Sequence, residues 1–270
     1  MLFFFSSLDG VISVPNGADL SLWLTRVSPG QTLLLATNGA YTLGDGAAGF
    51  STCPSGTSTQ HVTINGNGAT ITGGTVGINL LSKSYIDFLN IHLRNQTSCC
   101  VQPQSSHHIT FTDCTFASTA NPAGFVDVTK NRICNNIVYT RCHIYETLGV
   151  ATCDGFEFWD CDDCTCIDCS ASGLHNGPLE LNNGHAFEIY GENAGEACTN
   201  IQYIRCHAED CRCGFTVESP NGDTLHTAFL TDCTSTDMEF FDYNCEAPGV
   251  MTIVGYDGGT LGGNGTINHD

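Results

Sequence analysis

The sequence predicts an all-β solenoid, a chain of short strands that stack in successive coils. One strand phrase recurs along the chain at intervals of roughly 23–37 residues, and each copy has apolar residues at alternate positions, which is strand periodicity. A second strand phrase recurs between these copies. With 30 Gly and only 8 Lys and Arg residues in 270, the composition also disfavours long helices.

The two phrases set out the coils in order. Copies of the first occupy residues 85–91, 108–114, 136–142, 163–169, 200–206 and 226–233. Copies of the second occupy residues 124–128, 155–159, 186–190, 214–218 and 239–243. A single coil of this kind cannot bury its apolar face alone, so stacked coils must share one continuous core.

These phrases resemble a known fold. Strands of the type Ile-x-Ile-x-x-Cys that alternate with Gly-Phe-x-x-x are similar to the right-handed parallel β-helix of the pectin-lyase-like superfamily. Residues 19–30 and 31–43 resemble its N-terminal capping helix and first strand, and 61–72 resembles the next coil. The resemblance implies one right-handed parallel β-helix of about eight coils, with a short helix near 19–27.

The chain divides into three parts on this interpretation. Residues 1–17 begin with an apolar burst that lacks a basic segment, and we expect a leader or degenerate signal there. Residues 18–255 form the β-helix domain, and 256–270 are a Gly-rich C-terminal tail.

Stacking allows equivalent residues to be compared as columns, because neighbouring coils lie about 4.8 Å apart. The last position of the first phrase is expected to point into the core as a ladder: Ile91, Cys114, Cys142, Cys169, Cys206 and Cys233. These cysteines are predicted to be buried and mostly unpaired, because Cys is among the most buried residue types. The position before them reads Asn90, Asp113, Arg141, Asp168, Arg205 and Asp232. Its signs alternate, so Arg141 and Arg205 should brace neighbouring coils.

Cysteine is abundant, with 17 residues, which favours an oxidising compartment and hence an extracellular protein. Disulfides are expected among the loop cysteines Cys53, Cys99, Cys100, Cys153, Cys161, Cys164, Cys211 and Cys213. The cluster of Cys161, Cys164 and Cys166 has zinc ligation as an alternative, with His175 or Cys153 nearby. Two glycosylation sequons, at Asn95 and Asn264, are compatible with secretion.

The charge balance argues against several partners. The 28 acidic and 8 basic residues give a net charge of −20, whereas nucleic acids and anionic membranes require clusters of Lys and Arg. No stretch reaches the roughly 18 apolar residues that span a bilayer. An acidic polysaccharide would be repelled too, unless a bound cation reversed the local field.

The second phrase carries the candidate binding face. Its inner positions are apolar, so Glu157 and Glu188 are expected to face outward on neighbouring coils, with Asp127 in the same column. Oxygen ligands of this kind suit Ca²⁺, and these three carboxylates form a candidate calcium site. Trp159 and Tyr190 are expected to hold the face of a sugar ring. The alternative is a solvated acidic surface with incidental aromatic residues.

The same strands resemble polygalacturonase-type glycoside hydrolases in their layout. Asp154 and His185 match the Asp-Asp and Gly-His-Gly strands of that family. Ala123 stands where the family has a carboxylate, and Thr216 and Glu218 replace its basic pair.

Two catalytic chemistries remain open for these residues. Hydrolysis of a glycosidic bond requires two carboxyl groups, for which Asp154 with Glu157 or Glu188 are the candidates. Lyases of the same fold use Lys or Arg as a base, and Lys130 is then the candidate base, with Arg132 as a substrate contact.

Three functions follow from these observations. The first is an extracellular polysaccharide-active enzyme, either a hydrolase or a lyase. The second is a non-catalytic, calcium-assisted glycan-binding or adhesive β-helix. The third is a structural or ice-binding solenoid, although the Thr column that ice binding requires is interrupted by Leu89, Ile167 and Ile204.

Overall fold

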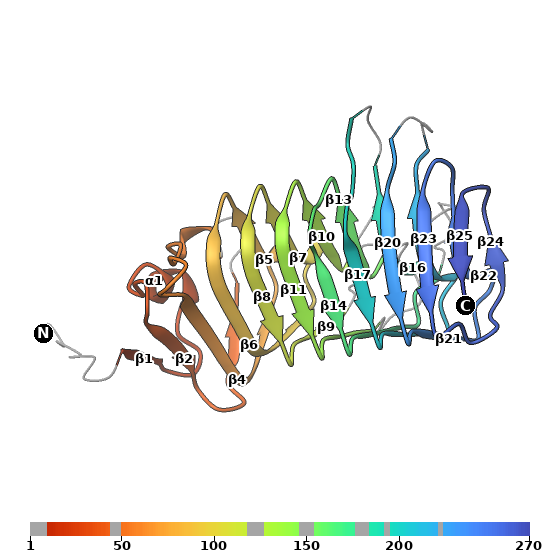
Figure 1. Cartoon of the computed structure of the whole chain (residues 1–270). Coiled ribbons are helices and arrows are strands. Elements are labelled where there is room, and N and C mark those ends of the chain that lie inside the picture. The colour runs from red at the N-terminus through yellow and green to blue at the C-terminus, as the bar shows by residue number, and fades with distance from the viewer. Residues whose placement is uncertain are drawn as a thin grey trace, which may run out of the picture.

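The computed structural model describes residues 10–43, 50–117, 127–145, 154–175, 184–191, 195–220 and 224–270. The strands wind into one parallel β-solenoid of about seven turns, close to the eight expected, and the coils stack in chain order (Figure 1). Only 4% of the residues are helical. The prediction of an all-β parallel β-helix is therefore confirmed.

Each coil places its strands on their counterparts in the next coil, in parallel register. Two of the three strand positions belong to a 17-stranded sheet that bends at a corner, and the third belongs to an 8-stranded sheet. The larger sheet contains β1 (Val11–Val14), β2 (Thr32–Leu35), β3 (Ala40–Thr42), β4 (Val62–Thr72), β6 (Ser84–Arg94), β8 (His107–Thr112), β9 (Thr115–Ala117), β11 (Asn135–Thr140), β12 (His143–Tyr145), β14 (Thr165–Ile167), β15 (Ser170–Ser172), β17 (Ile201–Ile204), β18 (His207–Glu209), β20 (Thr227–Thr231), β21 (Thr234–Thr236), β23 (Val250–Val254) and β25 (Thr266–His269). The smaller sheet contains β5 (Val76–Leu81), β7 (Cys99–Gln104), β10 (Thr129–Arg132), β13 (Phe156–Trp159), β16 (His185–Tyr190), β19 (Cys213–Glu218), β22 (Phe241–Cys245) and β24 (Leu261–Gly262).

The predicted capping helix is present at the N-terminal end (Figure 1). Helix α1 (Leu20–Leu24) begins after Asp19, whose carboxylate accepts a hydrogen bond from the backbone N–H of Ser21. A short 3₁₀ turn, η1, spans Phe50–Thr52. Strand β1 pairs with β2, and β25 pairs with β23, so the solenoid extends beyond the expected limits of 18 and 255 at both ends. Among the described residues, no helix has the length and apolar character needed to cross a membrane.

Left-handed residues mark the corner where the larger sheet bends. The column Asn90, Asp113, Arg141, Asp168, Arg205 and Asp232 has φ angles of 50–55°. The predicted braces are confirmed, because Arg141 donates two hydrogen bonds to Asp113, at 2.7 and 2.9 Å, and Arg205 makes the same pair with Asp168. All four side chains are exposed, so these ion pairs contribute little to stability.

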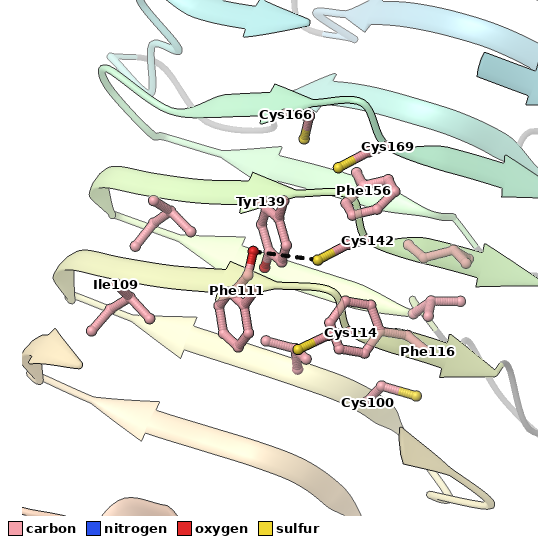
Figure 2. Packing of buried hydrophobic residues seen from close by; sticks show 14 of the residues in the cluster. Cys100, Ile109, Phe111, Cys114, Phe116, Tyr139, Cys142, Phe156, Cys166 and Cys169 are labelled. Atoms are coloured by element: carbon pink, nitrogen blue, oxygen red, sulfur yellow. Dashed lines mark hydrogen bonds between the residues drawn. The ribbon is translucent and has the colours of Figure 1, made fainter. Parts of the chain in front are cut away.

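Aromatic side chains stack in files inside the solenoid (Figure 2). The rings of Phe88 and Phe111 lie 5.0 Å apart, and those of Phe111 and Tyr139 lie 4.8 Å apart, all nearly parallel. A second file, on the smaller sheet, contains Phe156, Phe187 and Phe215. The regular spacing of the coils therefore lets rings on neighbouring coils stack within each file, and the first file ends at Tyr139, whose partner on the next coil is Cys166.

The ladder cysteines are buried, as predicted, with Cys114, Cys142, Cys169, Cys206 and Cys233 no more than 1% exposed. The predicted disulfides among the loop cysteines are wrong for the part of the chain that the structure describes. All sixteen cysteines there are buried free thiols, including Cys161, Cys164 and Cys166 of the zinc alternative. Cys153 lies outside the described residues.

The thiols form hydrogen bonds with backbone carbonyls at the corners instead. Nine cysteines directly follow a left-handed residue: Cys114, Cys134, Cys142, Cys161, Cys164, Cys169, Cys206, Cys211 and Cys233. In each of them Sγ donates to the carbonyl two residues earlier, at 3.1–3.6 Å. Cys142 also donates to the carbonyl of Phe111 on the preceding coil (Figure 2). Ser106, after left-handed Ser105, makes the same two kinds of bond through its hydroxyl, so a small donor suits the corner position, although Ile91 fills it after Asn90 without donating.

The register of the smaller sheet corrects one predicted column. Glu157 pairs with Glu188, as expected. On the other side Glu157 pairs with Lys130 and not with Asp127, which lies three residues earlier. A lysine therefore occupies the position where the sequence analysis placed a third carboxylate.

Candidate functional site

The candidate site lies on the face of the smaller sheet that points away from the core. Phe156 and Phe158 are fully buried in the core, so Glu157 between them points to the opposite face. However, Glu157 and Glu188 are each only 4% exposed. The expectation that these carboxylates lie on an open surface is therefore wrong, and buried carboxylates must be paired or protonated.

The ammonium of Lys130 compensates the negative charges of a first pair of carboxylates, Asp127 and Glu157. Its Nζ forms an ion pair with Asp127 and lies 3.7 Å from Oε2 of Glu157. Burial disfavours the charged amine, but Glu157 and Asp127 outweigh it and raise the pKa of Lys130, so the ammonium stays charged. Burial, reinforced by the charge of Asp127, raises the pKa of Glu157 well above its usual range. Burial also raises the pKa of Asp127, although Lys130 opposes the rise.

His185 is the centre of a second cluster. Its Nδ1 lies 3.3 Å from Oδ1 of Asp154 and 3.2 Å from Oε1 of Glu188. On the other side of the ring, Nε2 lies 3.5 Å from Oε1 of Glu218 and 3.3 Å from Nη1 of Arg212. The structure therefore places one imidazole among three carboxyl groups and a guanidinium, drawn from three successive strands of the smaller sheet and the turns before them.

The local backbone explains how His185 is held. Oδ1 of Asp154 accepts hydrogen bonds from the backbone N–H groups of Gly184 and His185, both at 2.9 Å. Gly184 has a φ of 101°, and a Cβ there would lie 2.9 Å from both Cβ of Arg212 and the carbonyl oxygen of Leu174. Glycine is thus required immediately before the histidine, and Asp154 positions the turn that carries it.

Burial sets the protonation of the carboxyl groups in this cluster. Burial, with a contribution from Asp154, raises the pKa of Glu188 to about 8. Burial also raises the pKa of Glu218 to about 7, although His185 opposes the rise. Burial lowers the pKa of His185, but the charges of Glu188 and Asp154 outweigh burial and raise this pKa well above its usual range. The cluster thus holds protons on carboxyl groups near neutral pH, which is the state that a general acid needs.

The candidate metal ligands are already engaged in hydrogen bonds and ion pairs with one another, with Lys130 and with the backbone. Between Asp127 and Glu157 lies the ammonium of Lys130, in the position that a calcium ion would need. Asp154, His185 and Glu188 are the described residues whose ligand atoms converge, all within 4.8 Å of one another. These atoms already bond to one another and to backbone N–H groups. Calcium therefore remains a prediction, and no catalytic step is derived through it.

The candidate sugar-stacking residues contact one another. Arg132 pairs with Trp159 in the sheet, and its guanidinium lies 3.9 Å from the centre of the Trp159 ring. Tyr190 approaches the same ring edge-on, with centroids 4.9 Å apart. The indole N–H donates to Oε2 of Glu196 at 2.7 Å. The predicted row of Arg132, Trp159 and Tyr190 therefore exists, but one face and one edge of the tryptophan are already covered.

A cavity of about 490 Å³ adjoins the histidine cluster. His185, Arg212 and Glu218 line it, and Glu246 and Phe240 from the next coil face them. Arg212 and Glu246 were not predicted as site residues from the sequence, and Glu218 stood out there only as a departure from a family pattern. The column of Trp159, Tyr190 and Glu218, which pair in register on neighbouring coils, was the sequence pattern that could have identified Glu218 as part of the cavity wall.

The predicted site residues thus divide into two groups. Asp127, Lys130 and Glu157 form one cluster, and Asp154, His185 and Glu188 form the other, beside the cavity. Ala123, which stands where the hydrolase pattern has a carboxylate, lies outside the described residues.

No protein-family model and no curated protein matches the chain. Solved structures do match over 96% of it. Pectate lyase Pel9A is 13% identical, with 78% of that chain covered and a TM-score of 0.57. The polygalacturonase from Erwinia carotovora ssp. carotovora is 10% identical, with 94% covered and a TM-score of 0.52. The endo-xylogalacturonan hydrolase from Aspergillus tubingensis is 11% identical, with 95% covered and a TM-score of 0.50. At these identities the likeness concerns architecture alone, and the chain has the parallel β-helix fold of the pectin-lyase-like proteins.

Proposed function

We propose that the protein is a polysaccharide-active enzyme that hydrolyses glycosidic bonds in the cavity beside His185. The observation that carries the proposal is a carboxyl group, Glu218, whose pKa is raised to about 7 and which lines a cavity together with a second carboxyl group, Glu246. Glycoside hydrolases require such a pair, with one member protonated and the other ionised. The fold shared with a polygalacturonase and a xylogalacturonan hydrolase supports a glycan as the substrate.

The residues have distinct roles in this proposal. Glu218 donates a proton to the leaving glycosidic oxygen, and Glu246 takes a proton from the water molecule that attacks the anomeric carbon. The negative charge of Glu246 contributes to the raised pKa of Glu218 and so keeps the acid protonated. His185 and Asp154 are positioning residues, because they hold the wall on which Glu218 lies.

A lyase is the weaker alternative, because its candidate base is not free to accept a proton. Lys130 is held as an ammonium by Asp127 and Glu157, and elimination requires a neutral amine at that position. Non-catalytic glycan binding is the second alternative, and the aromatic row of Trp159 and Tyr190 supports it.

Incubation with a panel of neutral and acidic polysaccharides tests the proposal. New reducing ends should appear without the ultraviolet absorbance of an unsaturated sugar, which a lyase would produce. E218Q and E246Q should each lose turnover, while E209Q, which changes an exposed carboxylate on the larger sheet, serves as the matched control. Activity should fall as the pH rises through about 7, because Glu218 then loses its proton.

The same experiment separates the alternatives. Binding without new reducing ends would favour the glycan-binding alternative. Loss of binding or turnover in EDTA, with rescue by Ca²⁺, would support the calcium prediction. Full turnover by E218Q would contradict the assignment of the acid.

A further inference from the structure

Two consecutive histidines at the start of β8, His107 and His108, lie with their ring nitrogens close together. Nδ1 of His107 is 2.9 Å from Nδ1 of His108. Both residues belong to the larger sheet, whereas the cavity is lined from the smaller sheet and its turns. Neither the proposed hydrolysis nor the candidate calcium site uses this pair of imidazoles.

The backbone explains why two consecutive side chains can meet. Along a regular strand they would point to opposite faces of the sheet. His108 instead has a φ of 54°, in the left-handed region, which breaks the alternation. Ile109 after it is fully buried, whereas His107 before it is exposed. The left-handed residue thus brings both imidazoles together outside the core.

The ring of Tyr85 supports both imidazoles from the preceding coil. Its centroid lies 5.5 Å from that of His107, edge-on, and 4.6 Å from that of His108. One coil further back, His61 packs on the same phenol ring at 5.4 Å, and Nδ1 of His61 lies 3.0 Å from Oδ2 of Asp87. The two imidazoles are therefore packed against a tyrosine that has its own support, and outer groups of this kind fix the orientation of metal-binding histidines.

The separation of the two nitrogens matches adjacent positions around a metal ion. Bonds from a metal to imidazole nitrogen are about 2.0–2.1 Å long, so two such nitrogens at a right angle lie about 2.9 Å apart. A tetrahedral angle would instead separate them by about 3.3–3.4 Å. Right-angled, tetragonal coordination by nitrogen is typical of Cu²⁺ and Ni²⁺, and Cu²⁺ binds such ligands most tightly in the first-row series.

We propose that His107 and His108 chelate one divalent transition-metal ion, with Cu²⁺ preferred, through their Nδ1 atoms. The ion replaces the proton of the hydrogen bond between the two nitrogens and keeps its other coordination positions for water. Ca²⁺ takes oxygen ligands, so it should not compete for these nitrogens. Asp154, His185 and Glu188 offer a separate set of ligand atoms on the smaller sheet, and the experiment must distinguish the two places.

Titration of the whole chain with copper(II) sulfate in a non-coordinating buffer, followed by electron paramagnetic resonance, tests the proposal. One equivalent of Cu²⁺ should give a tetragonal spectrum, and spin-echo modulation should count two bound imidazoles. H107Q and H108Q should each weaken binding by at least about ten-fold and lower the count to one.

H207Q is the matched control for these variants. His207 also begins a strand of the larger sheet, β18, but its Nδ1 contacts Oγ1 of Thr234 at 2.8 Å and not a second imidazole. H207Q should leave the copper affinity unchanged, and so should an excess of Ca²⁺ added to the wild type.

Folding and metal binding are measured separately, and circular dichroism establishes that each variant is folded. Equal copper affinity in the wild type, H107Q and H108Q would overturn the proposal, as would a spectrum with fewer than two imidazoles. A loss of affinity in H185Q but not in H107Q or H108Q would place the ion in the other cluster, and the proposal would be wrong. Because the readout is metal affinity and not glycan turnover, its failure is distinguishable from failure of the proposed hydrolysis.

Discussion

Replacing Lys130 with Met tests whether this ammonium neutralises the buried carboxylates, because methionine keeps most of the aliphatic stem and removes the charge. The separation of 3.7 Å between Nζ of Lys130 and Oε2 of Glu157 corresponds to an attraction of about 4–5 kcal/mol at an effective dielectric constant of about 20. Removal of one partner from a buried ion pair costs about 3–5 kcal/mol, since the other charge is left uncompensated. We expect K130M to lose about this much free energy of unfolding at mildly alkaline pH.

The loss should depend on pH in a defined direction. Burial raises the pKa values of Asp127 and Glu157, so the folded variant holds protons that the unfolded variant releases. Stability of K130M is therefore retained in acid, below the carboxyl pKa values of the unfolded chain. It falls as the pH rises through the higher values of the folded state. Urea unfolding followed by circular dichroism in acidic and alkaline buffers measures this difference.

A triple variant is the matched control for this prediction. K130M/D127N/E157Q removes the charges of the two carboxylates as well, and it should recover much of the stability that K130M loses at alkaline pH. If K130M is as stable as the wild type in alkaline buffer, or if the triple variant is no more stable than K130M, the buried ion-pair argument is wrong.

Substitutions at three further positions test the corner hydrogen bonds, the packing of the core and the exposed ion pairs. C142S should keep its stability, because the hydroxyl of Ser106 already donates a hydrogen bond to the carbonyl two residues earlier at another corner. C142V has no donor for this hydrogen bond and should lose about 0.5–1.5 kcal/mol of free energy of unfolding, measured in urea. F187A should lose about 3–5 kcal/mol in the same assay because it removes a fully buried ring from a stacked file, and a loss below about 1 kcal/mol would contradict that packing. R141A should leave the thermal midpoint unchanged because its ion pair with Asp113 is exposed, so a clear drop would show that the brace matters.

Local patterns in the sequence were sufficient to predict the fold. The period-2 phrases predicted the strands, and the alternating column predicted that Arg141 would pair with Asp113, because each depends only on spacing from one coil to the next. The burial of Cys142 followed from its place in the neighbouring ladder column.

The candidate site was harder to predict because it depends on register. Asp127 was predicted to share the column of Glu157, whereas in the structure Lys130, three positions later, pairs with Glu157. The contact between His185 and Arg212 joins residues 27 positions apart, on neighbouring coils, and no local pattern marks it.

Burial of the site could not be predicted from alternation alone. Alternation indicates which face of a strand a residue is on, but not whether that face is covered. Glu157 and Glu188 were correctly placed on the face away from the core and wrongly expected to be solvated. The cysteine count misled where it was interpreted as a sign of disulfides, because the described cysteines are free thiols. The oxidising compartment and secretion stay predictions.

The corner thiols affect how a chain like this one can change its length. A disulfide needs a second cysteine elsewhere, so the loss or duplication of one coil would leave a thiol without its partner. Here Sγ of Cys142 bonds to backbone carbonyls, which every neighbouring coil presents whatever its sequence. A duplicated coil would therefore bring its own donor and find its acceptors already in place. Each of the nine corner cysteines is therefore satisfied independently of the others, without a second cysteine.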